Sequence, residues 1–185
     1  FSADVWQQLL DDQNLVEIAQ AMVAAGGTGE AQNTFQDARL IAERVASNYL
    51  RSQALAQIAQ ALDTAKRTEE AQNTFQEARQ AAGRVEHNYR RSRALAQIAQ
   101  ALDTVGRTEE AQNTFQEARQ NAERVENDNL RSRALLHITQ ALAAAGKYQE
   151  ATRTTEHDDD RSQTLAQIVQ ALAAAGKFQE ATRTT

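Results

Sequence analysis

This chain of 185 residues has no cysteine, no proline and an aromatic content of only 5%. Without cysteine it forms no disulfide and carries no thiol chemistry, which leaves its cellular compartment open. No run of 18 apolar residues occurs, so the sequence predicts no membrane-spanning helix and no membrane partner. The net charge is −5, and the basic residues are scattered along the chain. Because nucleic-acid-binding proteins usually carry a basic stripe, we expect no nucleic-acid partner.

Motifs of catalysis and cofactor binding are absent as well. The sequence has no Gly-rich phosphate loop and no G-x-S-x-G, and its histidines, His87, His137 and His157, stand far apart. An isolated histidine is rarely catalytic without a partner, so His137 is expected to pack or to be solvated. Three aspartates follow His157 without EF-hand spacing, which favours a solvated linker over a metal site. We therefore predict a protein that is not an enzyme and has no cofactor and no metal.

The sequence does contain a repeat that recurs from end to end. Residues 51–90 and 91–130 differ at only 9 of 40 positions, and residues 11–50 are a looser copy. Residues 1–10 are either the tail of a preceding repeat or an N-terminal capping helix, and both interpretations predict a helix there. The sequence thus predicts a single repeat domain over 1–185, with full repeats at 11–50, 51–90 and 91–130 and short repeats at 131–160 and 161–185.

The first half of a full repeat has the apolar spacing of a helix. In residues 91–130 this stripe consists of Leu95, Ile98, Ala99, Leu102 and Val105. Gly106 follows it and is expected to end the helix, because glycine enters the left-handed conformation without a Cβ clash. Lys66 replaces this glycine in the previous repeat, so that turn is expected to be strained or differently closed.

The second half of the repeat predicts a second helix. Thr108 is a candidate N-cap, and Glu109 and Glu110 would meet the positive end of the helix dipole. The repeat is therefore interpreted as an antiparallel helical hairpin with a short turn at Gly106–Arg107. The apolar stripe of this second helix consists of Ala111, Phe115, Ala118, Ala122 and Val125.

These motifs resemble the tetratricopeptide repeat signature, with apolar substitutes at its large aromatic positions. The resemblance implies an all-α fold, an α-solenoid in which antiparallel helix-turn-helix repeats form a right-handed superhelix. The period is 40 residues here instead of about 34, and the family proline that closes each repeat is absent. A second helix lengthened by about two turns explains the difference, although other helical-hairpin families reach this period. The matching pattern is Leu95-x-x-Ile98-Ala99-x-x-Leu102, then Gly106, then Ala111-x-x-x-Phe115-x-x-Ala118.

The short repeats depart from this pattern. Thr155 occupies the position of Phe115, so the second helix of this repeat loses its main apolar anchor. We expect a helix of about ten residues that ends by His157.

The resemblance also implies a binding surface, because the first helices of such arrays line the inner, concave face. One glutamine per repeat would offer paired donors and acceptors to an extended peptide, and Arg93 and Arg133 would contact acidic groups. The alternative is that these glutamines are only good helix formers on a solvated face. The predicted concave-face residues are Gln20, Gln53, Gln60, Asp63, Arg93, Gln100, Asp103, Arg133, Gln140 and Gln170.

Three functions remain open at this stage. The leading one is a protein–protein interaction scaffold that binds a peptide or partner helix in the concave groove. The alternative is a structural module that assembles into a homo-oligomer through the exposed ends of the solenoid. The third is the interaction segment of a larger regulatory or catalytic protein.

Overall fold

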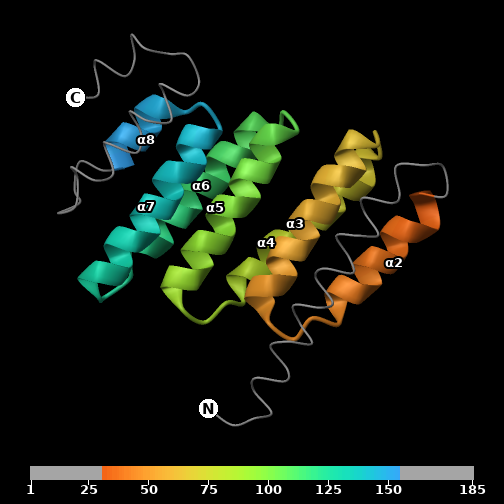
Figure 1. The fold of residues 1–185 in the computed structure, drawn as a ribbon, viewed down its shortest axis with the longest axis horizontal. Coiled ribbons are helices and arrows are strands. Elements are labelled where there is room, and N and C mark those ends of the chain that lie inside the picture. The colour runs from red at the N-terminus through yellow and green to blue at the C-terminus, as the bar shows by residue number, and fades with distance from the viewer. Residues whose placement is uncertain (1–30, 155–185) are drawn as a thin grey trace. The chain divides into compact units, whose positions relative to one another are not determined.

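The computed structural model describes residues 31–154, which form helices and no strand (Figure 1). The predicted all-α class is confirmed for this part of the chain. No helix within it is long and apolar enough to cross a bilayer. The predictions for residues 1–10 and 161–185, and for the first helix of the repeat 11–50, lie outside the described residues. The helices are α2 Ala31–Glu43, α3 Asn48–Thr64, α4 Thr68–Gly83, α5 Asn88–Thr104, α6 Thr108–Glu123, α7 Asp128–Ala144 and α8 Tyr148–Thr154.

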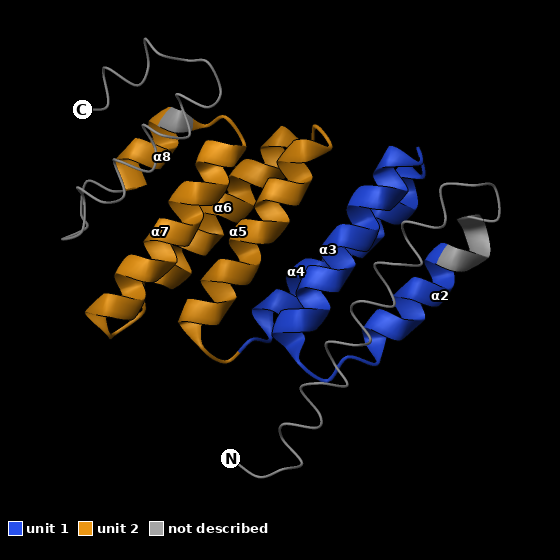
Figure 2. Cartoon of the chain, in the orientation of Figure 1, with its two compact units in different colours: residues 1–85 blue, residues 86–185 orange. Residues whose placement is uncertain are grey.

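Two compact units divide the chain after Val85 (Figure 2). In the first unit, α3 packs against α4 and α2. In the second unit, α5 packs against α6 and α7, and α7 also packs against α6 and α8. The α3–α4 and α5–α6 hairpins correspond to the two most similar repeats of the sequence.

The turn of each hairpin closes as the sequence predicts. Gly106 lies between α5 and α6 with φ of 80°. Its N–H donates to the Asp103 carbonyl at 2.9 Å, and the Arg107 N–H donates to the Leu102 carbonyl at 2.9 Å. This pair of bonds is a Schellman closure, which satisfies carbonyl groups that the helix end leaves without partners. The predicted turn at Gly106–Arg107 is confirmed.

Lys66 adopts the same closure without the help of glycine. Its φ is 61°, and its N–H donates to the Asp63 carbonyl at 2.8 Å. The Arg67 N–H donates to the Leu62 carbonyl at 2.9 Å, as in the glycine-containing turn. Of the two predicted possibilities, the strained turn is the one that forms.

The predicted N-cap at Thr108 is wrong by one residue. Helix α6 begins at Thr108 itself, and the cap position is Arg107, whose side chain makes no capping hydrogen bond. The Schellman closure leaves only three residues between the helices, so Thr108 is already helical and cannot cap. The expected acidic first turn, Glu109 and Glu110, is confirmed. Arg107 binds Glu110 at 3.2 Å instead of capping the helix.

The second helix ends before the last residue of its predicted apolar stripe. Helix α6 ends at Glu123, so Val125 lies beyond it in the connecting segment, although it is buried. Helix α5 has 17 residues and α6 has 16. The sequence pattern misled here because Val125 is buried by the hairpin fold and not by helical periodicity.

The core of the second unit follows the predicted stripes. Leu95, Ile98 and Leu102 of α5 are fully buried, and Phe115 of α6 fills the space between the helices with only 2% of its surface exposed. Ala111, Ala118 and Ala122 have no exposed surface, so the two helices approach closely.

Polar contacts fix the connecting segments to the helices. In the second unit, Arg131 of α7 donates to the Val125 carbonyl at 3.0 Å, and Asn88 of α5 donates to the Arg124 carbonyl at 3.2 Å. The two carbonyl groups belong to the segment that directly follows α6. The bonds therefore connect the N-terminal ends of α5 and α7 to this segment.

Candidate binding site between α5 and α7

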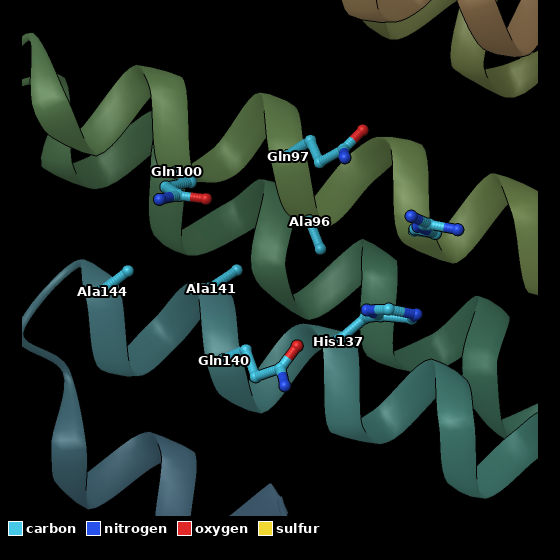
Figure 3. A pocket seen from close by; sticks show the side chains of 8 residues that line it. Ala96, Gln97, Gln100, His137, Gln140, Ala141 and Ala144 are labelled. Carbon is cyan, nitrogen blue, oxygen red and sulfur yellow. The ribbon is translucent and has the colours of Figure 1, made fainter. Parts of the chain in front are cut away.

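A hollow of about 310 Å³ lies between α5 and α7 of the second unit (Figure 3). Each helix contributes four residues to the walls of this hollow. Their spacing of three or four places the residues of each helix on one helical face. We call this feature the α5–α7 hollow. Its walls are formed by Arg93, Ala96, Gln97 and Gln100 of α5 and by His137, Gln140, Ala141 and Ala144 of α7.

The hollow brings together three of the predicted site residues, Arg93, Gln100 and Gln140. Arg133 lies one turn before His137 on α7, is exposed and does not line the hollow. Gln53, Gln60 and Asp63 belong to α3 in the first compact unit, and each is half-buried. Gln20 and Gln170 lie outside the described residues.

Asp103 has a structural contact that the sequence did not reveal. Its carboxylate pairs with the Lys147 ammonium at 3.2 Å, and the two side chains are only 17% and 16% exposed. The pair joins the end of α5 to the turn between α7 and α8. To contact a ligand as predicted, the Asp103 carboxylate would have to give up or share its ion pair with Lys147.

Arg93 is a cation without a counterion in the part of the chain that the structure describes. Arg67 and Arg107 pair with glutamates three residues along the chain, at 2.7 Å and 3.2 Å. Arg93 makes no such pair within residues 31–154, and no carboxylate lines the α5–α7 hollow. The half-buried guanidinium can therefore receive an external anion without first breaking an internal ion pair.

His137 is a wall residue that sequence reasoning did not place in the site. Its Nε2 lies 3.5 Å from the Tyr89 hydroxyl, and the two rings are tilted with centroids 6.4 Å apart. Burial lowers the pKa of His137 below its ordinary 6.5, and the charges of Arg93 and Arg133 lower it further, against a hydrogen bond with Gln140. The imidazole is therefore neutral at neutral pH, and the side chain, which was expected to pack or to be solvated, is half-buried.

Helical spacing was the signal that could have found the missed wall residues. His137 and Gln97 are four residues from Arg133 and Arg93, and three from Gln140 and Gln100. That spacing places them on the same helical faces as the predicted residues. The sequence could not show that these two faces meet across a hollow.

A second hollow of about 260 Å³ lies among α6, α7 and α8. Its polar walls carry charges of both signs, because Arg119 and Arg153 stand with Glu150. Phe115 and Leu142 form its apolar floor. Opposite charges within one small site favour internal pairing, so this hollow indicates no particular ligand.

Comparisons with known proteins support the fold and leave the function open. No family model matches the chain, and no curated protein matches it. It is similar to the crystal structure of Ton1535 from Thermococcus onnurineus NA1, with a TM-score of 0.63 and 20% sequence identity. The likeness covers 94% of this chain and 47% of that one, so this chain spans about half the length of that protein. At this identity the likeness indicates the fold alone.

Proposed function

We propose that this chain is a non-enzymatic interaction scaffold that binds an extended peptide or a partner helix at the α5–α7 hollow. We further propose that its helical hairpins belong to a right-handed superhelix of the tetratricopeptide type. The observation that carries the proposal is the hollow itself, which is lined by three side-chain amides and an arginine without a counterion in the described residues.

The chemistry of the walls suits a peptide backbone. Gln97, Gln100 and Gln140 each carry an amide N–H₂ group and a carbonyl oxygen, and a peptide presents donors and acceptors at nearly every residue. Ala96, Ala141 and Ala144 have small side chains, so a peptide backbone can approach the two helices closely. The volume is near the lower end of ligand sites, which fits a short peptide segment and not a large cofactor.

The first test uses glutamine substitutions on this surface. The variant Gln100→Arg with Gln140→Arg places two long cations into the hollow. The ligands are peptides that the unmodified chain selects from a random peptide array. We expect the variant to bind them at least tenfold more weakly, because the hydrogen bonds from the two glutamines are lost and the arginine side chains block the approach of the peptide backbone. Fluorescence anisotropy on the selected peptides measures the change.

The matched control is Gln80→Arg with Gln120→Arg, which makes the same chemical change at exposed positions of α4 and α6. We expect the control to keep the affinity of the unmodified chain. Peptides that bind all three proteins equally would move the binding site away from the α5–α7 hollow. An array with no bound peptide would overturn the scaffold proposal.

A further inference from the structure

The repeats differ in charge at the α5–α7 hollow. Arg93 stands where the previous repeat has Gln53, and this is one of the 9 differences between the two most similar repeats. His137 stands where α5 has Gln97, so the second wall also gains a basic group. Most of the surface is copied from repeat to repeat, but here neutral amides are replaced by groups that bind anions.

The surroundings of His137 are basic on both helices. From α5, Arg93 and Tyr89 face it, and from α7, Arg133 and Gln140 act on it. Among the described residues, no charged side chain of α6 or α8 lines the hollow. A chain with net charge −5 thus presents a local site with positive charge and, within residues 31–154, no carboxylate in its walls. Such a site complements an anion.

We propose that the α5–α7 hollow binds the side-chain carboxylate of an acidic residue in a peptide partner, and that His137 takes up a proton when this carboxylate enters. This inference rests on the proposed function and names the chemical class of its ligand. The proton comes from solvent and goes to the imidazole ring, while the carboxylate of the partner stays ionised.

The guanidinium of Arg93 supplies the first contact. Arginine binds carboxylate through two parallel N–H donors, and these charge-assisted bonds are about twice as strong as neutral ones. The protonated imidazole of His137, on the opposite wall, supplies a further donor. Arg133 continues the basic surface one turn beyond the hollow. A partner chain is therefore expected to run on past the bound carboxylate, which favours a side chain over a chain terminus.

Linkage gives the direction of the pH dependence. In the empty site, burial and the two arginines lower the pKa of His137. A bound carboxylate acts in the opposite direction, because it neutralises Arg93 and accepts a hydrogen bond from the imidazolium. Since the complex then holds a proton that the free protein lacks, affinity rises as pH falls through the histidine range. Each unit of difference between the bound and free pKa corresponds to a tenfold change in affinity.

The test uses three N-acetylated probe peptides of alanine and serine and follows the His137 ring by NMR. The first carries one central glutamate and an amidated C-terminus. The second replaces this glutamate by glutamine, and the third carries the same glutamine and a free C-terminal carboxylate in place of the amide. We expect the glutamate peptide alone to raise the pKa of His137 and to bind several-fold tighter at about pH 6 than at about pH 8.

Three variants separate the roles of the residues. Arg93→Gln, which introduces the residue found at position 53, should lower the affinity for the glutamate peptide at least tenfold. It should also raise the pKa of His137 in the free protein. His137→Gln, which copies Gln97, should keep binding and lose its pH dependence. Arg90→Gln removes an exposed charge of α5 outside the hollow and should change neither.

The remaining outcomes contradict the inference in different ways. A raised pKa of His137 with only the peptide that has a free C-terminal carboxylate would mean that the site recognises a chain terminus. Array-selected peptides that bind without regard to glutamate or pH would leave the scaffold function in place and remove the acidic ligand. If neither the probes nor any array peptide binds, both the inference and the proposed function fail.

Discussion

Lys66 holds a backbone conformation that two equivalent turns give to glycine. Its φ of 61° compares with 80° at Gly106 and 72° at Gly146. An L-residue in this region brings its Cβ close to the carbonyl oxygen, which costs about 1–2 kcal/mol. From the missing glycine alone, the sequence predicted a turn that is strained or differently closed. The strained turn forms, and the position could be identified from the sequence because the Schellman closure is a local structure that depends on very few residues.

A reciprocal exchange measures this strain. We expect Lys66→Gly to stabilise the α3–α4 hairpin by about 1 kcal/mol and Gly106→Lys to destabilise the α5–α6 hairpin by about the same amount. Apart from Gly106 itself and its two chain neighbours, a Cβ at Gly106 would meet no atom within 4 Å, so the change reports on the local backbone and not on a clash with another part of the fold. Amide hydrogen exchange of the two hairpins gives the local free energies of opening. Changes of the same sign in both hairpins would contradict the strain argument.

At the scale of the helices, apolar spacing predicted which residues are buried better than it predicted where helices end. Phe115 and Ala118 are buried as expected, whereas Thr108 and Val125 were assigned to the wrong side of a helix boundary. The apolar pattern predicts burial well, because the pattern directly records which residues are hydrophobic. Boundaries depend on turn closure and on long-range bonds such as that between Arg131 and the Val125 carbonyl.

The Asp103–Lys147 ion pair provides a test at the same scale. We expect Asp103→Asn to destabilise the second compact unit by about 0.5–1 kcal/mol, because it removes a largely buried ion pair between the end of α5 and the α7–α8 turn. Lys147→Gln should cost about the same, and the double variant should cost little more than either one. Urea denaturation measures the three values. Strictly additive losses would show that the pair contributes nothing.

The whole molecule is acidic, and its charge distribution leads to a simple expectation. The chain has 20 lysine and arginine residues against 25 aspartate and glutamate residues, and several arginines are already paired with carboxylates. Phosphate backbones are bound through several free cations at once. The local basic character of the α5–α7 hollow rests on very few groups, so it suits a single carboxylate better than a polyanion.

We therefore expect no binding of mixed single-stranded RNA, even at low salt where such binding is strongest. A filter-binding titration at neutral pH measures it, with a basic RNA-binding protein as the positive control. Salt-sensitive retention of RNA by this chain would contradict the expectation and would reopen the partner assignment.

The amino-acid sequence alone determined the repeat, the helical class, the buried stripes and the position of the hairpin turns. Each of these depends on residues close together in the chain, through helical periodicity or the conformational freedom of glycine. Tertiary structure decided the rest. It placed Arg93 and His137 on facing walls although they are distant in sequence, and it tied Asp103 to Lys147. Such contacts depend on how the hairpins pack, and the pattern within one repeat contains no information about that packing.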